Sequence, residues 1–251
     1  MSKMLSKKLL PIANRFLKPI VATTQSWSAS SITATKTSSR SISTERENHF
    51  KEIGYLDHEH SLTIFSTLHE MQVRSCQVYA ENELFGSFDE TDNSFKYITY
   101  EEFGNQVDTC RAVLKDLGVE EYGKVAIISN NRIEWVVIAC AAYSLNASLV
   151  PMYEAQLAKD WTYILNDSGA SAVVCATQDI YDQVHQEVLS QTPTVKASVC
   201  LDAPEGEPHA FRTLMVAAAN DDTSSSMIVK PTPEDLANLI YTSGTTGQPK
   251  G

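Results

Sequence analysis

The sequence predicts an α/β fold in which parallel sheets are flanked by helices. Short continuous apolar runs alternate with longer segments whose apolar residues recur every three or four positions. That alternation is typical of strands covered on both faces by helices. The last apolar run leads into a loop of hydroxyl-bearing residues and glycines. Because ligands of such folds bind beyond the carboxyl ends of the strands, the loop is a candidate binding site.

The first half of the predicted fold is organised around one well-marked helix. A helix over residues 61–78 and a short strand at Tyr97–Ile98 come before it. Thr99 with Glu102 three residues later predicts a capping box at its start. Phe103, Val107, Cys110, Leu114 and Leu117 then form one apolar stripe, and Gly118 can end the helix.

From residue 124 onward, strands and helices alternate regularly. The expected strands cover residues 124–129, 148–153, 171–176, 195–201 and 236–241. The first expected helix is opened by Asn131 and Glu134 and runs to about Asn146. The others span 159–167 before Gly169, follow the stripe Ile180, Val184 and Val188, and span 211–219. A helical turn at 232–235 should lead into the last strand.

Length and composition set limits on the protein class. At 251 residues and 43% hydrophobic content, the chain can bury a core of one or two domains. Its longest apolar run, Trp135–Tyr143, has nine residues, far short of the roughly 20 that span a bilayer, so a buried helix is expected there. The five cysteines are odd in number, widely spaced and never in a Cys-x-x-Cys pair. They predict free, reduced thiols, as in an intracellular compartment.

Charge is distributed unevenly along the chain. Residues 1–44 hold seven of the 20 Lys and Arg and no acidic residue, so the rest carries 13 basic and 31 acidic side chains, a net charge of about −18. Such a body repels nucleic acid, and no DNA or RNA partner is expected.

The basic leader has the features of a targeting segment. Leu5, Leu9, Ile12 and Phe16 share one helical face, although Pro11 weakens the helix, and a Ser/Thr-rich stretch follows to Thr44. This combination is typical of an organelle transit peptide, mitochondrial in the first place and plastid in the second. The alternative is a disordered tail of a cytoplasmic protein.

One short motif outside these segments could suggest a metal site. Asp57-His58-Glu59-His60 places two histidines two residues apart. Without further ligands nearby, this spacing is more typical of a solvated surface stretch than of a metal centre, and no metal site is predicted.

The loop at the end of the chain has the chemistry of a phosphate site. Two glycines free the backbone for close approach to a ligand, four hydroxyls and several N–H groups can converge on anionic oxygens, and Lys250 adds a positive charge. The residues are Thr242, Ser243, Gly244, Thr245, Thr246, Gly247 and Lys250. The spacing Gly-x-x-Gly-x-x-Lys differs from the Walker pattern and from the dinucleotide fingerprint. A flexible Gly/Ser/Thr tail is the alternative that composition alone would favour.

The order of these residues resembles a known signature. Tyr241-Thr-Ser-Gly-Thr-Thr-Gly-x-Pro-Lys-Gly251 is similar to the phosphate loop of the adenylate-forming (AMP-binding) superfamily. Four further segments, at residues 98–103, 125–131, 150–153 and 163–168, resemble the long-chain fatty acyl-CoA synthetase branch. The resemblance runs from about residue 50 to the end.

The resemblance implies an ATP-dependent acid–thiol ligase. It would form an acyl-adenylate from a fatty acid and Mg-ATP, and then acyl-CoA from coenzyme A, with the loop residues holding the β- and γ-phosphates. The cofactors implied are ATP and Mg²⁺, and peripheral contact with a membrane is compatible with the substrate. Residues 45–251 would be an incomplete N-terminal portion of the AMP-binding domain, with the catalytic residues beyond Gly251, so that the chain alone is not competent. The alternatives are a ligase for another carboxylic acid and a non-catalytic truncated protein.

Overall fold

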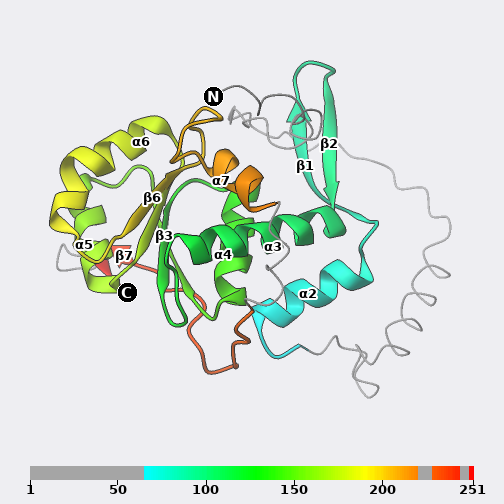
Figure 1. Cartoon of the computed structure of the whole chain (residues 1–251), viewed down its shortest axis with the longest axis horizontal. Coiled ribbons are helices and arrows are strands. Elements are labelled where there is room, and N and C mark those ends of the chain that lie inside the picture. Colours follow the sequence, from blue (N-terminus) through cyan, green and yellow to red (C-terminus); the bar gives the residue numbers. More distant parts are fainter. Residues whose placement is uncertain (1–64, 220–227, 244–248) are drawn as a thin grey trace, which may run out of the picture.

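The computed structural model describes residues 65–219, 228–243 and 249–251 (Figure 1). Its centre is a four-stranded parallel sheet with the strand order β4-β3-β5-β6. The strands are β3 (Lys124–Ile128), β4 (Ser148–Met152), β5 (Ala172–Cys175) and β6 (Ala197–Cys200). The predicted α/β class and its parallel sheet are confirmed.

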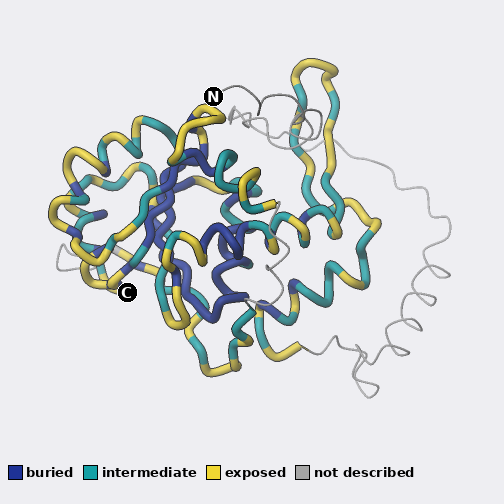
Figure 2. Tube along the Cα trace, in the orientation of Figure 1, coloured by how far each residue is buried: buried dark blue, intermediate teal, exposed yellow. Residues whose placement is uncertain are grey.

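Helices cover both faces of this sheet because alternate strand residues point to opposite sides. Val125, Ile127 and Val199 pack with the helices α3 (Tyr100–Asp116) and α4 (Ile133–Ser144). Ala126, Ile128 and Val173 pack on the other face. There they meet α5 (Ala158–Ser168) and the π-helical turn Val184–Val188 that continues α6 (Gln178–Gln183). A 3₁₀ turn, Leu189–Gln191, then leads toward β6. The buried strands form the middle of the molecule in Figure 2.

The apolar run around Trp135 is a buried helix, as predicted. Helix α4 packs into the larger core cluster, where Val137, Ile138 and Ala141 are almost completely inaccessible. No helix among the described residues is long and apolar enough to cross a membrane. The start of α4 differs from the prediction: it begins at Ile133, and the N-cap Arg132 makes no side-chain cap bond.

The signals at the ends of two other helices are confirmed. Thr99 and Glu102 form a capping box at the start of α3, each side chain bonding to the other's backbone N–H. Helix α5 ends at Gly169, whose φ of 67° lies in the left-handed region that glycine adopts without strain.

The sequence interpretation missed a β-hairpin before α3. Strands β1 (Glu83–Asp89) and β2 (Ser94–Thr99) follow α2 (Leu68–Val78), pair antiparallel and project from the body next to α3 (Figure 1). Only residues 97–98 were expected to be extended. Strand β1 has no clear apolar alternation, and the hairpin is fixed by tertiary packing, as between Phe85 and the α3 residue Phe103. The predicted helix over residues 61–78 is confirmed from Leu68, where Thr67 caps it; residues 61–64 lie outside the described part.

The C-terminal segment extends the four-stranded sheet by one short extended stretch beside β4. After α7 (Phe211–Ala218), the expected turn at 232–235 closes with a bond from the Asp235 N–H to the Thr232 carbonyl (3.1 Å). Residues 236–241 then run parallel to β4 and are joined to it by one bridge between Leu149 and Asn238. The predicted strand is therefore an extended segment with little regular pairing. Two-residue strands β7 (Thr242–Ser243) and β8 (Pro249–Lys250) follow it.

Candidate functional site

The segment that leads to the phosphate loop is firmly attached to the sheet. The backbone of Leu149 in β4 bonds to Ala237 and to Leu239, both at 2.9 Å. Two side chains add to this attachment: the Ser148 hydroxyl donates to the Leu236 carbonyl (2.7 Å) and the Tyr143 hydroxyl to the Asn238 side chain (2.9 Å). The segment runs parallel to β4, so it delivers the loop toward the carboxyl end of the sheet.

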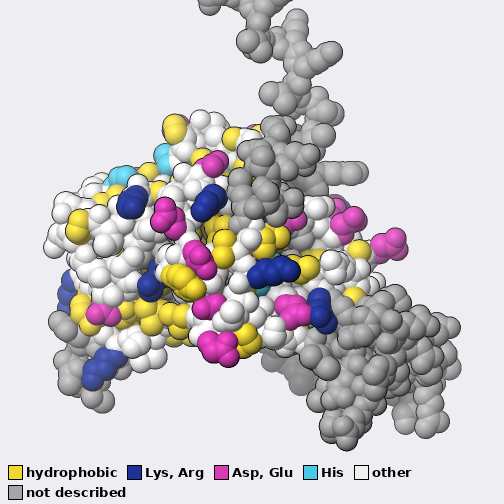
Figure 3. All heavy atoms as spheres, turned by 60° about the horizontal axis from the view of Figure 1, so that its bottom comes forward, with side chains coloured by type: hydrophobic (Ala, Val, Ile, Leu, Met, Phe, Trp, Pro, Cys, Tyr) yellow, Lys and Arg dark blue, Asp and Glu magenta, His cyan; other side chains and the backbone are white. Residues whose placement is uncertain are grey.

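The outer side of this segment stays open. Leu236 and Ile240 are 52% and 60% exposed, as expected for an extended segment at a sheet edge. The face of the molecule turned forward in Figure 3 carries hydrophobic side chains gathered across its middle. Among the described residues, this segment therefore forms an exposed edge of the sheet.

Tyr241 anchors the start of the loop in the core. Its side chain is only 5% exposed and packs edge-on against Tyr163 of α5, with ring centroids 6.5 Å apart. Its hydroxyl donates to the Asp167 carboxylate at 2.6 Å. Burial, and then the bond to the Asp167 carboxylate, raise the pKa of Tyr241 above its ordinary value, so the hydroxyl remains a proton donor.

The loop itself begins and ends in a small antiparallel stem. Thr242 lies opposite Lys250, and Ser243 lies opposite Pro249. The structure thus brings together three of the seven predicted phosphate-binding residues, Thr242, Ser243 and Lys250, across eight positions of sequence. Gly244, Thr245, Thr246 and Gly247 lie outside the described residues, and their predicted role stays a prediction.

Two side chains of the stem face solvent. Thr242 and Lys250 are both exposed, and no carboxylate of the described residues forms an ion pair with Lys250. A hydroxyl donor and an uncompensated ammonium group therefore lie side by side on adjacent strands. This arrangement suits an anionic ligand such as a phosphate chain, whose oxygens accept from both groups.

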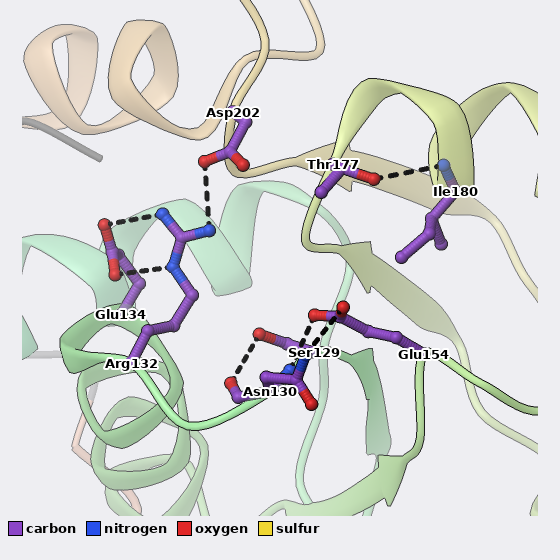
Figure 4. A network of polar contacts seen from close by, with 8 residues as sticks. All are labelled: Ser129, Asn130, Arg132, Glu134, Glu154, Thr177, Ile180 and Asp202. Carbon is purple, nitrogen blue, oxygen red and sulfur yellow. Dashed lines mark hydrogen bonds and ion pairs between the residues drawn. The ribbon is translucent and has the colours of Figure 1, made fainter. Parts of the chain in front are cut away.

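A second group of polar residues lies at the carboxyl ends of the parallel strands (Figure 4). Asn130, just after β3, donates its backbone N–H and its side-chain amide to the Glu154 carboxylate beyond β4, at 2.7 and 2.8 Å. Thr177, after β5, caps α6 through the Ile180 N–H. Sequence reasoning missed Glu154, because nothing in the spacing shows that its loop meets the loop of Asn130.

Arg132 is the centre of a separate set of ion pairs at the same edge of the sheet (Figure 4). It forms a two-pronged ion pair with Glu134 and a further pair with Asp202 beyond β6, both at 2.9 Å. Burial lowers the pKa of Arg132, but its bonds to these two carboxylates outweigh that effect and raise it above its ordinary value. Since both carboxylates already neutralise the guanidinium, the group ties strand ends together and offers no free cation to a ligand.

The prediction that the five cysteines form no disulfide is confirmed. All five cysteines are free thiols, and Cys110, Cys175 and Cys200 are buried. Burial raises the pKa of each of these thiols, so they stay protonated and unreactive. The stretch Asp57–His60 lies outside the described residues. Within the described ranges, no group of three His, Cys, Asp or Glu could hold a metal ion.

Comparison with known proteins agrees with this geometry. Residues 74–251 match the family of AMP-binding enzymes. The chain is 25% identical over 213 residues to fatty acyl-CoA synthetase B of Dictyostelium discoideum, covering 79% of this chain and 31% of that protein. It is 29% identical over 198 residues to the peroxisomal long chain acyl-CoA synthetase 7 of Arabidopsis thaliana, covering 74% of this chain and 28% of the relative. A third relative, the long-chain-fatty-acid–CoA ligase FadD15 of Mycobacterium bovis, is 32% identical over 162 residues, which are 64% of this chain and 26% of the ligase.

Solved structures share the fold. The N-terminal domain of FACL13 from Mycobacterium tuberculosis superposes with a TM-score of 0.61 at 22% identity, covering 74% of this chain and 44% of that one. The anthranilate CoA ligase AuaEII, solved with anthranoyl-AMP, gives a TM-score of 0.62 at 20% identity, covering 75% of this chain and 34% of the ligase.

The chain spans less than a third of the length of these curated relatives. The family match nevertheless covers most of the chain and includes the whole loop from Tyr241 to Gly251. The chain belongs to the family of AMP-binding enzymes.

Proposed function

We propose that the protein to which this chain belongs is an ATP-dependent acid–thiol ligase that makes acyl-CoA. The observation that carries the proposal is the stem of the phosphate loop, at the end of a segment fixed to β4. There Thr242 lies opposite Lys250, which forms no ion pair with a carboxylate of the described residues. The family match and the acyl-CoA synthetase relatives support the same reaction class.

The proposed reaction has two steps. A carboxylate oxygen attacks the α-phosphorus of ATP, so that an acyl-adenylate forms and pyrophosphate leaves. The sulfur of coenzyme A then attacks the acyl carbon and displaces AMP. The first step requires the protein to position the phosphates and to stabilise the charge that develops on pyrophosphate. Lys250 would supply the positive charge, and the hydroxyl and N–H groups of residues 242–247 would supply the hydrogen bonds.

Magnesium would enter this site with the nucleotide. The described residues contain no cluster of carboxylates that could hold the ion by themselves. Mg²⁺ is commonly bound through substrate phosphates together with one or two carboxylates.

For the substrate, we propose a long-chain fatty acid. Support comes from the printed names of the relatives, which include fatty acyl-CoA and long-chain acyl-CoA synthetases. Proteins with the same fold include an anthranilate CoA ligase, so aryl and other acids belong in the substrate panel of any test. For the location, we propose a mitochondrion, on the basis of the basic, acid-free residues 1–44.

The first prediction concerns Lys250. In the full-length product of the gene, Lys250→Ala should slow acid-dependent exchange of pyrophosphate into ATP by about a hundredfold, the typical cost of losing a preorganised group that stabilises developing charge. Exchange is measured with palmitate, octanoate, benzoate and anthranilate as acids.

Lys230→Ala is the matched control, because Lys230 is an exposed lysine of the same C-terminal region that lies before the attached segment. Exchange that is equally fast in wild type and Lys250→Ala would contradict the role of Lys250. If the wild type supports exchange with an aryl acid but not with palmitate, the substrate is an aryl acid and the proposed fatty acid is wrong. No exchange with any acid would favour a non-catalytic protein.

A further inference from the structure

Tyr241 links the two ends of the phosphate loop: its backbone leads into one end and its ring lies against the other. Tyr241 immediately precedes β7, so its backbone is continuous with Thr242. Gly251 immediately follows β8 and lies against the face of the same ring. A Cβ atom at Gly251 would come within 2.8 Å of Tyr241 Cζ. A side chain at position 251 would therefore displace either the ring or the stem.

Helix α5 holds the Tyr241 ring through two of its side chains. The Tyr241 hydroxyl donates to Asp167 at 2.6 Å, and Asp167 lies in the last turn of α5. Tyr163, one turn earlier on the same helix, packs edge-on against the ring. Trp161, Ile164 and Leu165 of α5 are buried in the same cluster as Tyr241, so the helix that carries Asp167 is itself fixed in the core.

We propose that Asp167 is a positioning residue for the phosphate loop: through the Tyr241 ring, it fixes the stem that holds Thr242 opposite Lys250. The inference rests on the ligase function proposed above; it gives a role to Tyr241, the first residue of the motif, and adds Asp167, which lies outside it. Asp167 touches no substrate and acts only through Tyr241.

The physical reason lies in the weakness of the stem. Two pairs of residues, Thr242 with Lys250 and Ser243 with Pro249, join β7 to β8, and an isolated hairpin of this length is not stable in water. A group that stabilises developing charge is effective only when it is held in place before the reaction. The buried ring, tied to a helix on one side and covered by Gly251 on the other, provides that fixed support.

The test is a comparison of steady-state constants in the full-length protein. Tyr241→Phe and Asp167→Ala should each raise KM for ATP about tenfold and lower kcat for acyl-CoA formation, with KM for the acid and for coenzyme A unchanged. Tenfold corresponds to about 1.4 kcal/mol of lost binding. The double variant should be no worse than either single one, because both changes remove the same hydrogen bond.

Two further variants sharpen the comparison. Asp167→Asn keeps an oxygen that accepts from the tyrosine and should restore most of the activity. Asp160→Ala removes a carboxylate from the same helix without touching Tyr241 and should behave as wild type.

The outcomes separate this inference from the proposed function. If wild type is active and both Tyr241→Phe and Asp167→Ala match Asp160→Ala, the positioning role is wrong. It is also wrong if all three Michaelis constants rise together while the thermal midpoint falls, because a general loss of structure then explains the result. If wild type itself activates no acid, the proposed function fails, whatever the variants do.

Discussion

At the scale of single residues, the described structure satisfies nearly all its buried polar groups, and the exceptions lie on one helix. His69 and Gln72 of α2 are each 7% exposed, yet His69 Nδ1 and Gln72 Oε1 have no hydrogen-bond partner. Burial is the main cause that lowers the pKa of His69 below its ordinary value of 6.5, and the nearby Arg111 adds to it. The folded protein therefore favours the neutral imidazole.

This burial predicts a dependence of stability on pH. Below pH 6.5, the unfolded chain binds a proton at His69 that the folded chain resists, so the free energy of unfolding should fall as the pH falls through that window. Urea unfolding at about pH 7.5 and about pH 5.5 measures the effect. His69→Gln should flatten the dependence. Equal slopes in wild type and His69→Gln would refute the assignment.

At the scale of elements, local chemistry sets where helices begin and end, and contacts decide the rest. Thr99 and Gly169 mark the start of α3 and the end of α5 because both signals act within one turn. Helix α4 lacks such a signal, and it begins where Arg132 and Asn130 turn to partners on other loops. The start of α4 is therefore a product of tertiary structure.

The capping box gives a prediction at this scale. Thr99→Ala should lower the free energy of unfolding by about 1 kcal/mol, because the Glu102 N–H loses its acceptor at the start of α3. Chemical denaturation measures the change. Thr109→Ala in the exposed middle of the same helix, where the hydroxyl bonds back to the Asn105 carbonyl, is the control and should cost less. A loss at Thr109 equal to that at Thr99 would contradict the role of the cap.

At the scale of the whole molecule, the charge of the chain is divided between a basic leader and an acidic body. Residues 45–251 carry 13 basic and 31 acidic side chains. Within the described part, Glu134 and Asp202 pair with Arg132 at the strand ends. No carboxylate of that part pairs with Lys250 in the same way. A locally positive stem on an acidic body is suited to an anionic ligand that Lys250 can attract at short range.

The proposed location can be tested at this same scale. A fluorescent protein fused behind residues 1–48 should accumulate in mitochondria, because the segment is basic, free of acids and apolar on one helical face. Replacing Lys7, Lys8, Arg15 and Lys18 by Gln should leave the fusion diffuse, and the unfused fluorescent protein is the control. Accumulation in plastids of a plant cell would show a plastid address in place of a mitochondrial one. A diffuse wild-type fusion would contradict the proposal that residues 1–44 are a transit peptide.

Much of the fold could be predicted from the sequence, and the reason is the regularity of its strands. The runs at Lys124–Ile128 and Ala172–Cys175 are buried on both faces, so an unbroken apolar pattern marks them without knowledge of their partners. The hairpin of β1 and β2 could not be found in this way, because its outer face is open to solvent. Phe88 and Phe95 there are 48% and 57% exposed.

The sequence by itself determined the α/β class, the capping signals and the order of residues from Tyr241 to Gly251 that resembles the phosphate loop of the AMP-binding family. These depend on local periodicity and on residue types at fixed spacing, which the chain carries without folding. Only the tertiary structure decided that Asp167 supports Tyr241 from 74 positions away, that Glu154 meets Asn130, and that segment 236–241 lies along β4. Such contacts depend on which surfaces are buried together, and local sequence patterns do not predict them.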